Sequence, residues 1–372
     1  MNADIDHSSE LAGSDAATSD PAATLSDLAA TTSDPAATTS GPAATLSEPA
    51  ATISDLAAQP IDLSTELAGL SLRSPLTTAS GTFGSGREFA QLWIDQGLVD
   101  PGQVFACLGA ITTKGVSPVP WLGNSGIRID ETASGMLNSI GLENPGVEAF
   151  CAEDLQWLAT QDVPVIVNVC GHTVDEYVSV IERLEHEDPV IAYELNISCP
   201  NLDAGGMSFG TDPVAAAAVT AACRQVSRRP LIAKLTPNVT DITVIAKAVE
   251  AAGADALSLI NTVSGMSIDI RSLKPVFERA VAGLSGPAIK PVALWAVYSC
   301  YRSTRLPIIG MGGVRSASDV IEFMLAGASV VAIGSHSFTD PLALPSIHAG
   351  LADWCDEHQI SELRSLIGAA HT

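Results

Sequence analysis

Eight short apolar runs, each ending in polar residues or glycine, follow one another along the chain from about Ile61 onward. They occupy residues 74–80, 107–115, 163–169, 192–198, 230–235, 255–262, 306–313 and 329–335. Parallel strands are covered on both faces and therefore read as nearly continuous apolar runs. Amphipathic helical patterns separate most of the runs, so the chain predicts an α/β fold, a (β/α)8 TIM barrel. A doubly wound open sheet is the alternative, but the dinucleotide fingerprint GxGxxG is absent.

The predicted helices carry recognisable end signals. The sequence TVDE at 173–176 is typical of a capping box, and SASD at 316–319 is a close variant of it. Gly253 and Gly327 each follow a helical pattern and precede a strand, as glycine stops do. These signals support the alternation of helices and strands.

Residues 1–60 form a repeat of seven residues, with copies such as SDPAATL and SDPAATT. A period of seven can indicate a coiled coil, but Pro21, Pro35, Pro42 and Pro49 would interrupt any helix. We therefore predict a disordered acidic tail over 1–60 and one barrel domain over 61–372.

Deleting residues 1–60 should leave the melting temperature of the barrel nearly unchanged, because a disordered tail contributes little packing. Thermal denaturation of the full and the truncated chain checks this. A fall of several degrees in the truncated chain would show that the tail docks on the domain.

The net charge of the chain is −24. Residues 1–66 hold eleven Asp or Glu and no Lys or Arg, which leaves −13 for the rest. So acidic a chain argues against nucleic-acid binding, although a few local cations could still hold an anionic substrate. No apolar run approaches the ~18 residues of a membrane helix, and the N-terminus lacks the features of a secretory signal. We expect a cytoplasmic protein without membrane attachment.

The cysteines are odd in number and scattered. They are Cys107, Cys151, Cys170, Cys199, Cys223, Cys300 and Cys355. No CxxC pair and no zinc or iron–sulfur spacing is present, so the pattern fits a reducing compartment and predicts no metal site. Most of these thiols should be small buried apolar groups.

Polar residues and glycines end all eight predicted strands. These ends hold Ser80, Lys114, Asn168, Asn196 with Cys199, Lys234, Asn261 with Thr262, Gly312 with Gly313, and Gly334 with Ser335. In a (β/α)8 barrel the C-terminal strand ends surround the active site. A single asparagine at a strand end is usually a turn former, but eight such ends in one ring indicate a binding site.

The residue types suggest what this site binds. Glycines after the last two strands let backbone N–H groups approach a phosphate. Lys114 and Lys234 end apolar runs, where a lysine needs a negatively charged partner. The carboxamides of Asn138, Asn196, Asn201 and Asn261 offer donors and acceptors that could read the edge of a pyrimidine dione.

Cys199 could be a nucleophile, a base or a structural thiol. A nucleophilic cysteine usually has an orienting histidine. Only His172 and His336 follow strand ends, and neither has an obvious partner in the sequence. A thiolate that takes a proton from carbon therefore fits better than acyl transfer.

Several long motifs in one order resemble the dihydroorotate dehydrogenases, a family of FMN-dependent (β/α)8 barrels. The motifs are ASGTFGSG, GMLNSIGLENPG, ELNISCPN, KLTPN, INTVSGM, LSGPAIKPVA and GGVRSA, and the match runs from about residue 66 to 345. The resemblance implies oxidation of (S)-dihydroorotate to orotate in pyrimidine biosynthesis. In this family the cysteine of the NISCPN loop, here Cys199, takes the C5 proton while hydride passes from C6 to N5 of FMN.

The resemblance also assigns binding residues. The substrate would be held by Lys114, Asn138, Ser139, Ile140, Gly141, Leu142, Asn196, Asn201, Asn261 and Thr262. The flavin would be held by Ser80, Lys114, Gly115, Asn168, Asn196, Lys234, Ile260, Gly286, Gly312, Gly313, Gly334 and Ser335.

The segments NLDAGGMSFG and LSGPAIKPVA resemble the NAD-linked type of the family, class 1B. That type is a catalytic subunit that passes electrons to NAD through a partner subunit carrying FAD and a 2Fe–2S cluster, in a heterotetramer of two catalytic and two electron-transfer chains. Three alternatives remain. The first is the fumarate-linked type of the same family, and the second is a different FMN barrel enzyme that acts on pyrimidine bases. The third is a binding scaffold without catalysis.

Overall fold

The computed structural model describes residues 61–198 and 209–371. The predicted tail, Cys199 and Asn201 lie outside these residues.

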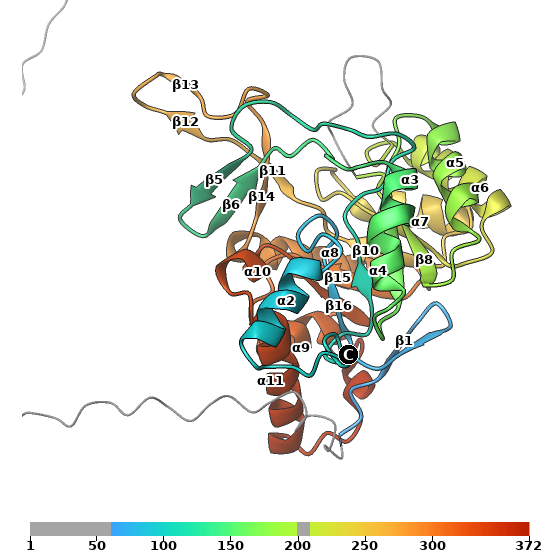
Figure 1. Cartoon of the computed structure of the whole chain (residues 1–372), viewed down its shortest axis with the longest axis vertical. Helices are drawn as coiled ribbons and strands as arrows, with labels where there is room; N and C mark the ends of the chain where they lie inside the picture. The colour runs from blue at the N-terminus through green and yellow to red at the C-terminus, as the bar shows by residue number, and fades with distance from the viewer. Residues whose placement is uncertain (1–60, 199–208, 372) are drawn as a thin grey trace, which may run out of the picture. The chain divides into compact units, whose positions relative to one another are not determined.

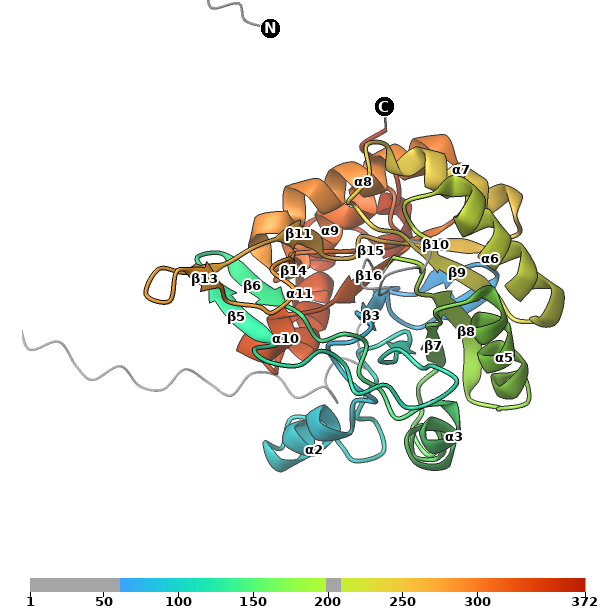
Figure 2. The same cartoon turned by 90° about the horizontal axis from the view of Figure 1, so that it is seen from above.

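Eight parallel strands form the central sheet, and helices lie around it (Figures 1 and 2). The strands are β3 (Leu76–Thr78), β4 (Ile111–Thr112), β7 (Val165–Val169), β8 (Val190–Leu195), β9 (Leu231–Lys234), β10 (Ala256–Leu259), β15 (Ile308–Met311) and β16 (Val330–Ile333). Each lies within or overlaps one of the eight predicted apolar runs. Their order in the sheet, β3-β16-β15-β10-β9-β8-β7-β4, places strands that follow one another in the chain side by side.

The sheet closes nearly completely into a barrel. Its two edge strands, β3 and β4, meet through a parallel bridge between Thr77 and Ala110. The backbone N–H of Gly109 donates to the carbonyl of Leu76 at 2.9 Å, and the Thr77 hydroxyl donates to the carbonyl of Ala110 at 2.9 Å. The predicted TIM barrel is therefore confirmed.

Helices and short helical turns connect the strands. They are α2 (Arg87–Asp95), α3 (Val147–Ala149), the π-helical η1 (Phe150–Leu155), α4 (Gln156–Leu158), α5 (Val174–Leu184), α6 (Pro213–Val226), α7 (Ile242–Ala251), η2 (Pro287–Ile289), α8 (Lys290–Ser303), α9 (Ala317–Leu325), α10 (His336–Thr339), α11 (Ala343–Glu357) and η3 (Leu363–Leu366). No helix within the described ranges is both long and apolar enough to cross a membrane.

The two predicted capping boxes differ in the structure. Ser316 and Asp319 exchange hydrogen bonds between side chain and backbone, so the variant SASD forms the complete box. The Thr173 hydroxyl caps α5 by accepting from the N–H of Glu176 at 3.3 Å. The Glu176 carboxylate, however, accepts from the N–H of His172 at 2.6 Å. The predicted box at 173–176 is therefore only half formed, because its acidic side chain reaches one residue further back.

The side chains inside the barrel change from apolar to polar along the barrel axis. A lower layer is apolar and includes Ile166, Ala192, Ile232, Ala256 and Ile309. Inward side chains recur every second residue along a strand, so the next positions of β7, β8, β9 and β10 form a layer above it. That layer consists of Asn168, Glu194, Lys234 and Ser258, all buried. A polar layer thus lies beneath the C-terminal mouth of the barrel.

A second sheet lies at this mouth, in addition to the eight predicted strands. It is antiparallel, with the order β11-β14-β6-β5. Its strands are β11 (Val263–Gly265), β14 (Ala282–Ser285), β6 (Gly135–Asn138) and β5 (Ile129–Thr132). Two hairpins complete the fold: β1 (Thr65–Leu67) with β2 (Leu70–Leu72), and β12 (Ile268–Asp269) with β13 (Lys274–Pro275). The β12–β13 hairpin lies on the same side of the barrel as β5 and β6 (Figures 1 and 2).

Candidate active site

A cavity of about 810 Å³ opens at the C-terminal mouth of the barrel. All eight barrel strands contribute to it, through Ser80, Lys114, Asn168, Asn196, Lys234, Asn261, Gly312 and Gly334. The antiparallel sheet adds a wall with residues from β5, β6 and β14. Convergence of all eight strand ends on one hollow is the arrangement that (β/α)8 enzymes use for catalysis.

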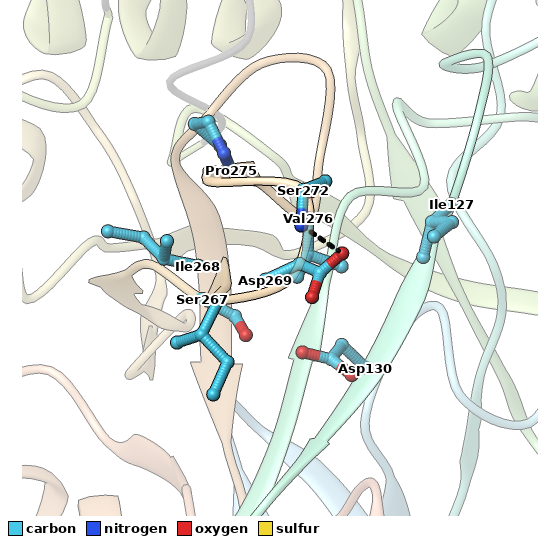
Figure 3. A pocket seen from close by; sticks show the side chains of 9 residues that line it. Ile127, Asp130, Ser267, Ile268, Asp269, Ser272, Pro275 and Val276 are labelled. Atoms are coloured by element: carbon cyan, nitrogen blue, oxygen red, sulfur yellow. Dashed lines mark hydrogen bonds between the residues drawn. The ribbon is translucent and has the colours of Figure 1, made fainter.

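A second cavity, of about 510 Å³, lies between β5 and the β12–β13 hairpin (Figure 3). Its lining includes Asp130, Asp269 and several aliphatic side chains. The Asp269 carboxylate accepts from the backbone N–H groups of Arg271 and Ser272, at 2.9 and 3.3 Å, and so serves the hairpin turn. Among the described residues, no lysine or arginine lines this cavity. The cavity at the barrel mouth is therefore the candidate active site.

The structure brings the sequence-predicted site residues together. Every one of them that is described lines the cavity at the barrel mouth: Ser80, Lys114, Gly115, Asn138, Ser139, Ile140, Gly141, Leu142, Asn168, Asn196, Lys234, Ile260, Asn261, Thr262, Gly286, Gly312, Gly313, Gly334 and Ser335. Their individual roles stay predictions.

The floor of the cavity carries a buried cation. The Lys234 side chain is 5% exposed, and its ammonium donates to the hydroxyl of Ser80 at 2.7 Å. It also lies 3.6 Å from a carboxylate oxygen of Glu194, which is 1% exposed. A buried lysine requires such partners. The site therefore offers a fixed positive charge, directed toward a ligand from below.

A second cation lies at the rim. The Lys114 ammonium is 3.8 Å from Oε2 of Glu143, and the same oxygen accepts from Arg128 Nη1 at 2.9 Å. Both side chains of the first pair are more than one-third exposed, so the pair is weak. Lys114 can consequently exchange Glu143 for an anionic ligand at small cost.

Hydrogen-bonded carboxamides link the C-terminal ends of β7, β8 and β10 at the cavity. Asn261 Nδ2 donates to the Ser198 hydroxyl at 2.8 Å, and that hydroxyl donates to Asn196 Oδ1 at 3.0 Å. Asn196 Nδ2 in turn donates to Asn168 Oδ1 at 3.2 Å. Carboxamides held by one another present donors and acceptors in fixed directions, as recognition of a heterocycle requires.

Glycines allow close approach of the backbone on the far side of the cavity. Gly312 has φ +125°, and a Cβ there would lie 2.9 Å from the Ala293 Cβ. Gly313 has φ +77°, and a Cβ there would lie 2.8 Å from the carbonyl oxygen of Gly286. A side chain at either position would be strained and would clash, so the loop after β15 keeps its backbone bare toward the cavity.

None of the six described cysteines is among the residues that line the cavity. All are buried. Burial raises the pKa of Cys107, Cys223 and Cys300 to about 12 and that of Cys151 to about 11. These thiols are protonated at neutral pH, which confirms the expectation that most cysteines are small buried apolar groups.

The two histidines at strand ends have different environments. His336 lines the cavity, its Nδ1 is 3.1 Å from the Thr339 hydroxyl, and burial lowers its pKa. The His172 ring packs against Trp121 with centroids 4.1 Å apart and the ring planes tilted by 33°, and it is not among the cavity residues. Neither arrangement indicates a cysteine–histidine pair among the described residues.

The segment 199–208, with Cys199 and Asn201, lies outside the described residues, but the residues that flank it are described. Ser198, the last residue before it, is bonded to the carboxamides described above. After it, Gly210 packs so closely on the carbonyl of Ile197 that a Cβ would lie 2.5 Å from that oxygen. Ser198 and Gly210 therefore both lie close to the C-terminal end of β8.

Sequence reasoning does not single out several residues of the site. Glu194 and Glu143 lie inside two of the motifs given above, but their partners come from distant parts of the chain. Asn238 lines the cavity and links two loops: it donates to the carbonyl of Thr262 at 3.0 Å and accepts from the N–H of Ser264 at 2.8 Å. Its position in KLTPN, just after a strand, is the signal that could have found it.

Comparisons with known proteins agree with this architecture. The model of the family described as "Dihydroorotate dehydrogenase" matches residues 62–354. The chain is 52% identical over 302 residues to the "Dihydroorotate dehydrogenase B (NAD(+)), catalytic subunit" of Alkaliphilus oremlandii, covering 81% of this chain and 96% of that protein. It is 51% identical over 303 residues to the protein of the same description from Pelobacter propionicus, covering 82% and 96%.

A solved structure also matches: that of DHODH in complex with ferulenol from Eimeria tenella, with a TM-score of 0.68 and 20% identity, covering 83% of this chain and 89% of that one. At this identity the likeness shows the fold alone.

Proposed function

Because the chain belongs to the dihydroorotate dehydrogenase family, we propose that it oxidises (S)-dihydroorotate to orotate with FMN bound at the barrel mouth. The observation that carries this proposal is the sequence identity of 52% with a relative of that description, over 81% of this chain. The cavity supports it, because cations, carboxamides and bare glycine backbone converge there from all eight strands.

The residues present fit FMN. A flavin needs a positive group near its pyrimidine edge and backbone donors for its phosphate. The buried ammonium of Lys234 meets the first need, and Ser80, Asn168 and Ile260 line the same cavity. The loops after β15 and β16, with Gly312, Gly313, Gly334 and Ser335, meet the second. FMN, when bound, supplies the acceptor for the hydride that leaves C6 of the substrate.

Lys114 and the loop 139–142 hold the carboxylate of the substrate in this proposal. The loop residues and Lys114 line the same cavity. Because the N–H of Ser139 donates to the carbonyl of Arg128 at 2.8 Å, the N–H groups of residues 140–142, together with the ammonium, are the ones suited to a carboxylate. Asn138, Asn196, Asn261 and Thr262 orient the ring, and Asn201 completes the set by resemblance. An oriented ring presents the same C5 and C6 hydrogens in every turnover.

Replacing Lys114 with alanine should weaken orotate binding about ten- to a hundredfold, because a hydrogen bond to a charged group contributes about 1.5–3 kcal/mol. Uracil, which lacks the carboxylate, should bind the variant and the wild type alike. Fluorescence or calorimetric titration with both ligands measures this. Lys247→Ala on α7 is the matched control, since that lysine is exposed and does not line the cavity. Equal losses for both ligands would place the carboxylate elsewhere and would favour a pyrimidine-base substrate.

Cys199 is the base that takes the proton from C5. Support comes from the NISCPN motif and from the site: the segment that carries Cys199 starts at Ser198, which is fixed by Asn196 and Asn261. The six other thiols are buried. Burial disfavours the thiolate, which is the form of cysteine that receives a proton from carbon.

Electrons pass on to NAD through a partner subunit that carries FAD and a 2Fe–2S cluster, in a cytoplasmic heterotetramer of two chains of each kind. The relatives' description as a catalytic subunit with NAD(+) supports this. Within the described residues no group of three or more potential metal ligands occurs.

The acceptor is tested by supplying dihydroorotate together with NAD, fumarate or a quinone, with and without a co-expressed electron-transfer subunit. NAD reduction that depends on the second subunit is the expected result. Turnover with fumarate by this chain alone would identify the fumarate-linked type instead.

A further inference from the structure

Glu194 is a buried carboxylate whose role is not explained by the binding residues above. It lies in β8, in the polar layer below the cavity, and is not part of the cavity lining. Its side chain is 1% exposed. Burying an ion pair stabilises a fold little or not at all compared with apolar residues of similar volume. The presence of a charge here therefore calls for a functional reason.

Three side chains from three neighbouring strands hold this carboxylate. Asn168 Nδ2 donates to Oε1 at 2.6 Å, and the Ser258 hydroxyl donates to Oε2 at 2.7 Å. The ammonium of Lys234 lies 3.6 Å from Oε1. Since Asn168 and Lys234 both line the cavity and Glu194 does not, the carboxylate acts on the cavity through them.

The first effect is on charge. Lys234 is the cation in the floor of the cavity, and it is directed there through its hydrogen bond to Ser80 at 2.7 Å. With Glu194 beside it, the pair has no net charge, so the positive potential that reaches a ligand is smaller than that of a free lysine. The carboxylate thus limits how strongly the floor favours added negative charge on the ligand.

The second effect is on the direction of hydrogen bonds. An ionised carboxylate only accepts, so Asn168 must turn its amide nitrogen toward Glu194 and its oxygen toward Asn196. Each further link then points the same way, from Asn261 through Ser198 and Asn196 to Asn168, at 2.8, 3.0 and 3.2 Å. Because the amide nitrogen of Asn261 donates a hydrogen bond to Ser198, the Asn261 side-chain oxygen is the atom available to accept from a ring N–H.

We propose that Glu194 is a positioning residue that sets both the charge presented by Lys234 and the donor–acceptor direction of the carboxamides from Asn168 to Asn261. It thereby tunes the reduction potential of the bound flavin and the recognition of the pyrimidine ring. This inference rests on the proposed function, since it takes FMN and a pyrimidine as the ligands.

The test compares wild type with Glu194→Gln, which keeps the shape of the side chain and removes its charge. The midpoint potential of the bound FMN, measured without substrate, should become more positive, because the uncompensated Lys234 favours the reduced flavin and its added negative charge. Orotate should bind about tenfold more weakly, since a glutamine replaces the charge-assisted hydrogen bond from Asn168 with a weaker neutral one and so fixes the carboxamides less firmly. Glu148→Gln is the matched control: its exposed carboxylate pairs with Arg183 on the outside of the barrel, and both values should stay unchanged.

Equal potentials in folded, flavin-loaded wild type and Glu194→Gln would overturn the assignment. If Glu194→Gln does not fold, Glu194→Asp decides, because it keeps the charge and withdraws it from Lys234 by one methylene. The midpoint potential of FMN in Glu194→Asp should also become more positive, by less than in Glu194→Gln. A potential equal to that of wild type would again overturn the assignment. Wild-type protein that binds no flavin would instead contradict the proposed function.

Discussion

Replacing Cys199 with alanine should lower the rate of dihydroorotate oxidation by about 10²- to 10⁴-fold, the usual contribution of a positioned general base. The variant should still be yellow, because most of the residues that fit FMN come from other strands. Exchange of the C5 hydrogen of dihydroorotate with solvent should be lost along with turnover. Steady-state kinetics, flavin absorbance and NMR of the substrate measure these three quantities.

Cys223→Ala is the matched control for Cys199→Ala. Cys223 is a buried thiol of α6, burial raises its pKa to about 12, and it does not line the cavity. Its loss should leave the rate within about twofold of wild type, because it touches no reacting group. Wild-type turnover in Cys199→Ala would exclude this residue as the base and leave the source of proton abstraction open.

Replacing Lys234 with methionine should lower the free energy of unfolding by about 3–5 kcal/mol, the usual cost of leaving a buried charge without its partner. The carboxylate that loses its partner is Glu194, at 1% exposure. FMN affinity should fall as well, since the cation in the cavity floor is gone. Urea denaturation of the apoprotein and titration with FMN separate the two effects.

The double variant Lys234→Met/Glu194→Gln should recover most of the lost stability, because it removes both charges of the pair. It should not recover FMN affinity. A single variant Lys234→Met that is as stable as wild type would show that the ion pair of Lys234 with Glu194 contributes no stability. Recovery of FMN affinity in the double variant would contradict a role of the ammonium in binding.

The barrel could be predicted from the sequence because its strands are buried on both faces. Runs such as 163–169 and 230–235 are apolar throughout, and few structures besides a buried parallel sheet produce such runs in alternation with helices. Strand boundaries are harder to predict: the run 107–115 contains only the short strand Ile111–Thr112. The polar residues of the site followed from the strand order, since parallel strands deliver their C-terminal ends to one mouth.

The antiparallel sheet could not be predicted in the same way. Its strand β5, with the sequence IDET, is half exposed and shows no apolar run. It pairs with β6, and β6 pairs with β14 about 145 residues later. No local sequence pattern predicts pairing over such a distance, so this wall of the cavity could be identified only from the structure.

Glu194 illustrates a limit of a different kind. Lys234 is predictable as a site residue because a lysine at the end of an apolar strand needs a partner. The partner could not be named from the sequence, because Glu194 lies on the neighbouring strand and depends on Asn168 and Ser258 from two others. Such contacts depend on which strands are neighbours in the sheet and on which side chains point into the barrel.

The central claim is that the cavity at the barrel mouth holds FMN and passes the electrons of dihydroorotate to it. Anaerobic mixing of the purified, flavin-loaded chain with dihydroorotate, in the absence of any other acceptor, tests this most directly. The flavin absorbance should bleach in a single turnover, with one orotate formed for each FMN reduced. A flavin that stays oxidised in excess dihydroorotate, in protein that binds orotate, would contradict the claim.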